Sequence, residues 1–271
     1  MLDQININDI TNIAKAAGDA IMKIYKKDFH IEFKDDESPL TEADIKSNEI
    51  ICNALANLYP NIPILSEENK AVSFRDRKKW EYFWLIDPID GTKEFIKKNG
   101  EFTVNIALIH KNTPVLGVVY APVPNIIYYA KKGIGAFKNT ERLPLVKNDT
   151  PEKYLNVVAS KSHLSKETRE FIDRLALTTQ ELSLVSKGSS LKLCMIAEGT
   201  ADIYPRLAPT MEWDTAAAHA IVLETGKGVF QYQNDFFSKK RKPASVVYNK
   251  PDLHNPWFVV YKYDRYGTST P

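Results

Sequence analysis

The chain has 271 residues and a formal net charge of +2 at pH 7, with 44% of its residues hydrophobic and 26% charged. These values are ordinary for a globular protein of one large domain or two closely joined halves. The small net charge excludes the strong basic excess typical of proteins that bind a nucleic-acid polymer. No run approaches the roughly 18 apolar residues of a membrane span, and residues 1–8 lack the basic and apolar segments of a secretory signal.

The two cysteines, Cys52 and Cys194, lie within apolar stretches and are not part of a wider Cys or His cluster. They predict buried thiols of a reducing compartment rather than a disulfide framework or a zinc site. We therefore expect a cytoplasmic protein. Peripheral attachment to the cytoplasmic face of the inner membrane and formation of homo-oligomers are both compatible with the sequence.

The first half of the chain is predicted to be rich in strands. Apolar residues recur at helical spacing in residues 8–27 and 41–59, which predicts two amphipathic helices with a charged hairpin or loop at 28–40 between them. Residues 69–79 form a polar, basic connector. Short apolar runs bounded by turn residues predict strands at 62–65, 83–86, 102–109, 115–120, 126–130, 135–138 and 143–146.

The second half alternates between strand and helix patterns. Strands are predicted at 155–159, 181–185, 201–204, 228–232, 245–248 and 258–261, and helices at 165–175, 188–198 and 212–224. We expect a layered α/β architecture in which halves of roughly 1–150 and 151–271 pack closely as a single unit, with the functional site between them.

The stretch from residue 83 to residue 92 carries the strongest chemical signal. A buried strand is followed by Asp87 and Asp90, and Pro88 is predicted to end the strand pairing. Gly91 and Thr92 then open a helix, whose N-terminus favours an anion. Carboxylates crowded in this way repel unless a cation lies between them, and Mg²⁺ prefers such oxygen ligands. The stretch therefore predicts a metal ion beside a phosphate.

Two further acidic segments are candidates for the same site. Glu67 and Glu68 end the strand at 62–65, where the alternative is a solvated acidic loop. Asp214 follows Trp213 at a predicted helix start, where the alternative is a simple interaction with the helix dipole.

Thr41 and Asp44 fit a variant of the helix capping box, which explains both residues without any chemistry. Alternatively, Asp44 accepts a hydrogen bond from the Thr92 hydroxyl, so that Thr92 can take a proton from an attacking water.

A second phosphate would need donors of its own. The segment Gly188-Ser189-Ser190 with Lys192 supplies N–H groups, hydroxyls and a cation at a predicted helix start, and residues 161–163 add further candidates. The alternatives are an ordinary helix start for this segment and a structural salt bridge for Arg206.

Taken together, Glu67-Glu68, residues 87–92 and Trp213-Asp214 resemble the inositol-monophosphatase-like superfamily of Mg²⁺-dependent, lithium-sensitive phosphatases. Within it, the runs 91–95, 99–105, 204–206 and 211–217 are similar to the bisphosphate nucleotidase branch. Inositol phosphatases more often carry Asn where this chain has Glu94.

The resemblance implies a five-layer αβαβα sandwich and a site with two Mg²⁺ ions, with room for a third, weaker one. Glu67, Asp87 and the carbonyl of Ile89 would hold the first ion, and Asp87, Asp90 and Asp214 the second. Asp44, Glu67 and Thr92 would be catalytic. Substrate contacts would come from Glu67, Ile89, Asp90, Gly91, Thr92, Gly188, Ser189, Ser190, Lys192 and Asp214.

The implied reaction is hydrolysis of the 3′-phosphate of adenosine 3′,5′-bisphosphate to AMP and phosphate by an activated water, with 3′-phosphoadenylyl sulfate as a second candidate substrate. The alternative enzyme is an inositol or sugar phosphatase with the same metal core. A non-catalytic protein that binds phosphorylated metabolites is a further alternative, but every matching metal position retains its carboxylate.

Overall fold

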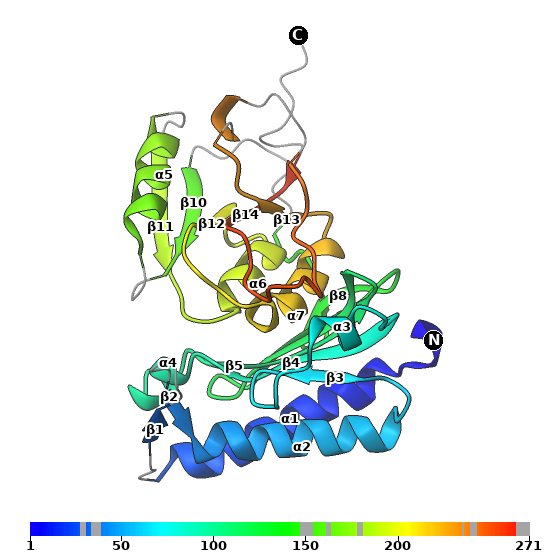
Figure 1. Ribbon diagram of the computed structural model, residues 1–271. Coiled ribbons are helices and arrows are strands. Elements are labelled where there is room, and N and C mark those ends of the chain that lie inside the picture. The colour runs from blue at the N-terminus through cyan, green and yellow to red at the C-terminus, as the bar shows by residue number, and fades with distance from the viewer. Residues whose placement is uncertain are drawn as a thin grey trace.

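A computed structural model describes the chain except for residues 28–30, 34–38, 147–153, 161–163, 178–180, 235, 239–242 and 264–271. Helices α1 (Ile7–Tyr25) and α2 (Glu42–Leu58) cover one face of a seven-stranded sheet. Helices α6 (Leu191–Glu198) and α7 (Glu212–Leu223) separate this sheet from a five-stranded sheet, whose far face is covered by α5 (Lys166–Ala176) (Figure 1). The predicted αβαβα sandwich is confirmed.

The seven-stranded sheet follows the chain order. Its strands are β3 (Ile64–Ser66), β4 (Tyr82–Asp90), β5 (Thr103–His110), β6 (Thr113–Ala121), β7 (Ile126–Lys131), β8 (Gly135–Lys138) and β9 (Glu141–Arg142). Strand β3 pairs parallel to β4, and the other neighbours are antiparallel. Because β3 and β4 run in the same direction, the residues that follow them emerge at the same edge of the sheet.

Both faces of this sheet are buried, so its strands have nearly continuous apolar sequences. In β5, Val104, Ile106 and Leu108 face α1 and α2, whereas Ala107 and Ile109 face α7. The face of β5 that packs on α7 is thus defined by its odd-numbered residues.

The five-stranded sheet has the order β11-β10-β12-β14-β13. Its strands are β10 (Tyr154–Ala159), β11 (Glu181–Ser186), β12 (Ile203–Arg206), β13 (Gly228–Gln231) and β14 (Phe258–Tyr261). Strands β11 and β12 lie parallel to β10, and β14 is antiparallel to both β12 and β13. The smaller elements are β1 (Ile31–Phe33), β2 (Pro39–Thr41), α3 (Phe74–Arg77), α4 (Thr92–Ile96) and two short 3₁₀ turns, Leu2–Gln4 and Phe236–Ser238.

The prediction that Pro88 ends strand pairing is wrong. Strand β4 continues to Asp90, and its pairing with β5 shifts between Asp87 and Asp90. Pro88 lies inside this irregularity, where the ladder is already interrupted and its missing N–H costs no strand bond.

Two predicted strands are also wrong. Residues 143–146 form no strand, because the N–H groups of Leu145 and Val146 both donate to the carbonyl of Glu198 at the end of α6. Residues 245–248 make only an isolated bridge from Ser245 to Phe230 of β13. Leu143, Val246 and Tyr248 are buried without a continuous backbone ladder, whereas Leu145 and Val146 are exposed.

The connector at 69–79 contains the short helix α3, which its polar sequence did not predict. Ser73 caps α3, and Arg77 at its end is only 2% exposed. The Arg77 guanidinium donates to Asn249 Oδ1 at 2.8 Å and to the carbonyl of Pro251 at 2.9 Å. The connector therefore ties the first part of the chain to its last part. Among the helices described, none is long and apolar enough to cross a membrane.

Candidate active site

The turn at the end of β4 is held in one conformation by its own hydrogen bonds. The Ile89 N–H donates to Asp87 Oδ1 at 3.1 Å, and Ser47 of α2 donates to the carbonyl of Pro88 at 2.9 Å. Gly91 caps α4 with a φ of +96°, a left-handed conformation that favours glycine. A Cβ at this position would also lie 3.3 Å from the carbonyl oxygen of Glu101.

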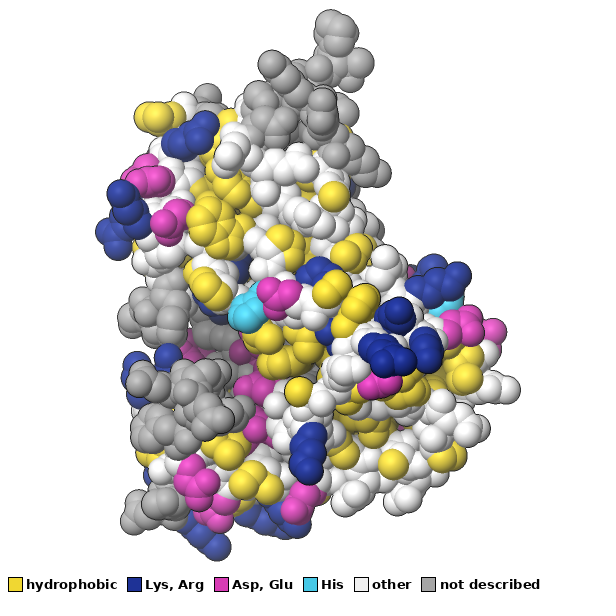
Figure 2. Space-filling model, in the orientation of Figure 1, with side chains coloured by type: hydrophobic (Ala, Val, Ile, Leu, Met, Phe, Trp, Pro, Cys, Tyr) yellow, Lys and Arg dark blue, Asp and Glu magenta, His cyan; other side chains and the backbone are white. Residues whose placement is uncertain are grey.

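Three carboxylates converge beside this turn. Glu67 follows β3, Asp87 lies in β4 and Asp214 lies in the first turn of α7, and one ligand oxygen of each lies within 4.8 Å of those of the other two. Ile89 and Asp90 line the same pocket. The residues predicted to hold metal are thus brought together, and on the face shown in Figure 2 acidic side chains gather in the recess between the upper and lower parts of the molecule.

The cluster is electrostatically strained. Burial raises the pKa of Asp87 well above its usual value, and the nearby Glu67 and Asp90 raise it further. Burial and the Asp90 charge raise the pKa of Asp214 in the same way. A divalent cation among these oxygens would relieve the repulsion, and an all-oxygen donor set is what Mg²⁺ prefers. The residues therefore fit a magnesium site.

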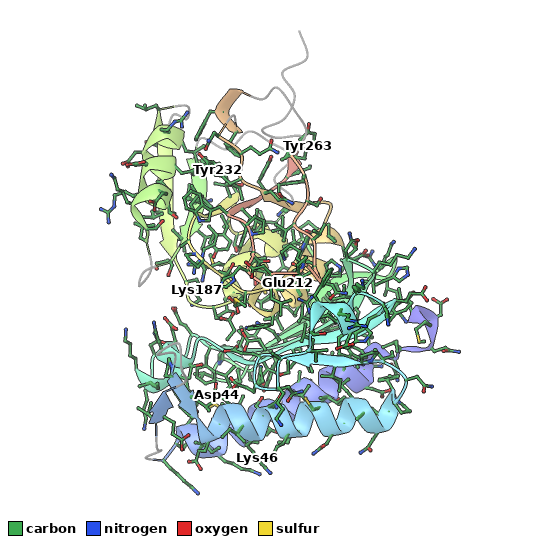
Figure 3. The ribbon with its side chains drawn as sticks, in the orientation of Figure 1. Asp44, Lys46, Lys187, Glu212, Tyr232 and Tyr263 are labelled. Atoms are coloured by element: carbon green, nitrogen blue, oxygen red, sulfur yellow. The ribbon has the colours of Figure 1, made fainter. Side chains whose placement is uncertain are left out.

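Asp44 lies at the start of α2 on the side of the sheet, whereas Lys46 lies on the outer side (Figure 3). Asp44 Oδ2 accepts hydrogen bonds from the N–H and hydroxyl of Thr41 at 2.8 and 2.6 Å, which completes the predicted capping box. Its Oδ1 accepts a hydrogen bond from the Thr92 hydroxyl at 3.2 Å. Burial raises the pKa of Asp44, which the hydrogen bonds partly offset.

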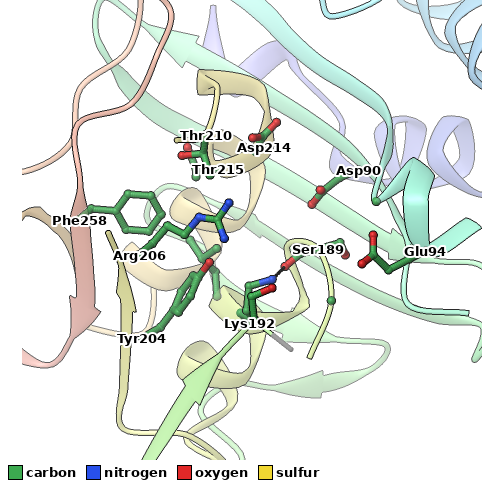
Figure 4. Close-up of a pocket in the computed structure, with 14 residues that line it drawn as sticks. Asp90, Glu94, Ser189, Lys192, Tyr204, Arg206, Thr210, Asp214, Thr215 and Phe258 are labelled. Carbon is green, nitrogen blue, oxygen red and sulfur yellow. Dashed lines mark hydrogen bonds between the residues drawn. The ribbon is translucent and has the colours of Figure 1, made fainter. Parts of the chain in front are cut away.

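A second pocket adjoins the carboxylates and is lined mainly by residues of the second half (Figure 4). Lys192 is 6% exposed, and its ammonium donates to the carbonyl of Ser189 at 2.7 Å and lies 5.6 Å from the Tyr204 ring centroid. Burial lowers the pKa of Lys192 to about 8. Arg206 donates to the carbonyl of Pro209 at 3.1 Å, and its guanidinium points into the pocket. No carboxylate of the described residues forms a salt bridge with it.

The segment 188–192 differs from its prediction in two respects. Helix α6 begins at Leu191, so Gly188 and Ser189 lie in the loop before it, where they line the pocket together with Lys192. Ser190 does not line the pocket, because its hydroxyl is directed at Asp90 Oδ2, 2.7 Å away. The predicted contact between Ser190 and substrate is therefore not supported. Residues 161–163 lie outside the described part of the chain.

Two polar residues near the site belong to the run 99–105 that carries the resemblance, but the sequence analysis gave neither of them a role of its own. Thr103 and Asn105 lie on the face of β5 that carries Ala107 and Ile109, and both are buried. The available signal was the pattern itself, since two polar residues at alternate positions begin a strand that is otherwise apolar on that face.

A layered α/β fold with clustered carboxylates next to a cationic pocket defines a metal-dependent phosphatase. The chain belongs to the inositol monophosphatase family, which it matches over residues 2–257.

Several relatives are similar to the chain over nearly its whole length. The 3′(2′),5′-bisphosphate nucleotidase CysQ of Shigella flexneri is 46% identical over 268 residues, which cover 97% of this chain and 100% of the relative. The protein of the same name from Escherichia coli K12 is 45% identical with the same coverage. The crystal structure of CysQ from Bacteroides thetaiotaomicron has a TM-score of 0.82 and 42% identity, covering 94% of this chain and 97% of that chain.

Proposed function

We propose that this protein is a Mg²⁺-dependent 3′(2′),5′-bisphosphate nucleotidase that hydrolyses the 3′-phosphate of adenosine 3′,5′-bisphosphate to AMP and phosphate. One structural observation carries the proposal: the carboxylate pocket and the cationic pocket adjoin each other and share Asp90, Gly91, Glu94 and Asp214. A substrate with two phosphates can place one in each. The similarity to curated nucleotidases along the whole chain supports the same substrate.

In this proposal Glu67, Asp87 and the Ile89 carbonyl would hold one Mg²⁺, Asp87, Asp90 and Asp214 would hold a second, and the site would have room for a third, weaker ion. The ions supply Lewis acidity, which lowers the pKa of water and neutralises charge on the phosphoryl oxygens. Gly91 and Thr92 contact the scissile phosphate through their N–H groups.

Thr92 and Asp44 provide the path for the proton. The Thr92 hydroxyl lies 3.2 Å from Asp44 Oδ1 and 3.3 Å from the carbonyl of Ile89, and a carboxylate is the stronger acceptor of the two. When Thr92 donates to Asp44, its oxygen keeps lone pairs that accept the proton of the attacking water. Glu67 lines the same pocket as Thr92 and can assist in removing the proton from the water. No covalent bond between phosphate and protein is needed.

Lys192, Arg206 and Ser189 bind the phosphate that is not cleaved. The two cations are at least partly buried, and a buried cation gains from an anionic partner because desolvation otherwise disfavours its charge. The planar guanidinium of Arg206 suits a bidentate contact with phosphate oxygens. 3′-Phosphoadenylyl sulfate carries the same 3′-phosphate and is proposed as a second substrate.

The test is phosphate release from adenosine 3′,5′-bisphosphate and from inositol 1-phosphate, each with Mg²⁺ and with EDTA. We expect release from the nucleotide that requires Mg²⁺. Preference for the inositol ester would contradict the proposed substrate but not the proposed metal site. Release in EDTA would contradict the proposed metal site.

A matched pair of variants tests the cationic pocket. Arg206→Met should raise the KM for adenosine 3′,5′-bisphosphate by about tenfold or more and leave the KM for 3′-AMP, which lacks the second phosphate, unchanged. Arg206→Lys retains the charge and should show a smaller loss. An equal rise in KM for both substrates would contradict the assignment of Arg206 to the second phosphate.

The cysteines support a cytoplasmic location. Cys52 and Cys194 are both free thiols; Cys194 is buried as predicted, whereas Cys52 is only partly buried. We propose that the protein works in the cytoplasm, and fractionation of cells that express it, with detection in soluble and membrane fractions, tests this location. Recovery outside the cytoplasm would contradict it.

A further inference from the structure

Three buried polar residues lie behind Asp90 without belonging to the carboxylate cluster. Thr103 and Asn105 of β5 are 0% and 1% exposed, and Ser190, immediately before α6, is 1% exposed. In the register of the sheet, Asp90 pairs with Thr103 and Asp87 pairs with Asn105. Buried polar groups are costly unless they are hydrogen-bonded, so the partners of these residues define what they do.

Their hydrogen bonds form a chain that ends on Asp90. The Thr103 hydroxyl lies 3.1 Å from Asn105 Oδ1, and Asn105 Nδ2 lies 2.8 Å from the Ser190 hydroxyl. The Ser190 hydroxyl lies 2.7 Å from Asp90 Oδ2. Asn105 Nδ2 also reaches the same Asp90 oxygen at 3.5 Å.

The direction of each bond follows from the chemistry of the groups. An ionised Asp90 can only accept, so the Asn105 atom that faces Asp90 Oδ2 and Ser190 is the amide nitrogen. Asn105 Oδ1 then faces the Thr103 hydroxyl, which also lies 3.2 Å from the Ser189 hydroxyl. Ser190 then has its own proton left to donate, either to Asp90 Oδ2 or to the carbonyl of Asp214 at 2.8 Å. The ionised carboxylate is the stronger acceptor. Ser190 and the Asn105 amide therefore both donate to Asp90 Oδ2, and Thr103 donates to the oxygen of that amide.

We infer that Thr103, Asn105 and Ser190 are positioning residues that hold the Asp90 carboxylate in the orientation needed to bind Mg²⁺. Ser190 thus acts through Asp90 and does not touch the substrate. The inference rests on the proposed function, since it takes Asp90 as a metal ligand. It also links the two parts of the chain, because Asp90 and Asn105 belong to the seven-stranded sheet whereas Ser190 precedes a helix of the middle layer.

The test measures Mg²⁺ binding without any substrate. EDTA-treated protein is titrated with Mg²⁺, and the concentration that gives half of the full rise in Tm is recorded. Ser190→Ala should raise this concentration by about tenfold, at the lower end of the range for groups that orient metal ligands. Ser190→Thr keeps the hydroxyl and should restore the wild-type value. At saturating Mg²⁺ the KM for the nucleotide should be unchanged in both variants.

Thr103→Val provides an independent test that preserves side-chain shape. It removes the donor to the Asn105 amide, which is one step further from Asp90 than Ser190 is. It should therefore weaken Mg²⁺ binding, but less than Ser190→Ala does. If Ser190→Ala does not fold, Thr103→Val replaces it in the test.

Two results would overturn the inference alone: wild-type Mg²⁺ dependence in both Ser190→Ala and Thr103→Val, or a raised nucleotide KM with unchanged Mg²⁺ dependence in Ser190→Ala. A wild-type protein whose Tm does not respond to Mg²⁺ would overturn the proposed function together with it.

Discussion

In the proposed site, Asp44 and Asp214 would each serve a helix and the reaction at once. Each occupies the third position of its helix and accepts a hydrogen bond from the N–H of the N-cap residue, Thr41 at 2.8 Å or Met211 at 2.9 Å. Asp44 turns its other oxygen to Thr92, and Asp214 also belongs to the carboxylate cluster. The capping role and the functional role therefore do not compete. The cap fixes the side chain in the position that the site requires.

Thr92 should be essential for the chemical step and dispensable for the fold. Thr92→Ala removes the hydroxyl between the attacking water and Asp44, so kcat should fall by about 10²–10⁴-fold while the nucleotide KM changes little. Thr92→Ser keeps the hydroxyl and should retain most of the activity. Steady-state kinetics of both variants check this, and a Thr92→Ala enzyme with near-normal kcat would contradict the proton path.

The ionisation of Lys192 should set the upper pH limit of the enzyme's activity. Burial lowers its pKa to about 8, so the ammonium loses its charge as pH rises through this value and no longer attracts phosphate. The value of kcat/KM for adenosine 3′,5′-bisphosphate should therefore fall above about pH 8, because this ratio reports the ionisation of the free enzyme.

A variant that retains charge is the control. Lys192→Arg has a guanidinium that stays protonated throughout this range, so its pH profile should lack the alkaline decline. A decline that persists unchanged in Lys192→Arg would assign the titration to another group.

At the scale of the elements, the sequence was sufficient where pattern and local chemistry agreed. The apolar run at 83–86, the capping box at Thr41 and the helical spacing of residues 8–27 each specify a local structure, and β4, α2 and α1 confirm them. The failures share one cause. Residues 143–146 and 245–248 have apolar side chains typical of strands, but the partners of their backbone groups come from distant parts of the chain, which periodicity cannot show.

The start of α2 allows stability and activity to be separated. The Thr41 hydroxyl accepts a hydrogen bond from the Ala43 N–H at 3.2 Å and donates one to Asp44 Oδ2. Thr41→Ala should lower the free energy of unfolding by about 1 kcal/mol, as loss of an N-cap usually does. It should also lower kcat several-fold, because Asp44 loses a donor that orients it. Denaturant unfolding and steady-state kinetics measure the two effects.

Asn6→Ala is the matched control in the same layer. Asn6 caps α1 by accepting a hydrogen bond from the Asn8 N–H at 3.1 Å, and in Figure 1 this end of α1 lies across the molecule from α4. It should cost a similar free energy of unfolding and leave kcat unchanged. Equal effects of both variants on kcat would show that Thr41 acts only through stability.

At the scale of the whole molecule, the site exists only because distant segments meet. Glu67 directly follows β3, Asp87 lies in the neighbouring strand β4, and Asp214 lies in a helix far along the chain. The cationic pocket adds residues of α6 and β12. An ion pair of 3.2 Å between Glu101 and Lys187 joins the two parts of the chain near this pocket. The sequence alone identified candidate residues for a metal site, and only the resemblance to a known family indicated that they lie together. The role that we infer for Ser190 could not be predicted from the sequence, because the direction of a hydroxyl depends on tertiary contacts, here with β4 and β5.

Removal of metal should make the stability of the whole protein depend on pH in a defined direction. Burial and neighbouring carboxylates raise the pKa of Asp87 and Asp214 in the folded state above the usual 3.8. The folded, metal-free protein therefore keeps protons that the unfolded chain has released, and its stability falls as pH rises from this value through the raised pKa. Mg²⁺ competes with these protons, so its stabilising effect should grow as pH rises.

Thermal unfolding between about pH 5 and about pH 8, in EDTA and in excess Mg²⁺, measures this dependence. The rise in Tm on addition of Mg²⁺ should be smallest at the acid end and largest at the alkaline end. Asp87→Asn removes one charge from the cluster and should make the metal-free protein less sensitive to pH, whereas Asp173→Asn, at an exposed position of α5, should behave as wild type. A Mg²⁺ effect that is constant across this range would mean that the ion does not bind at the buried carboxylates.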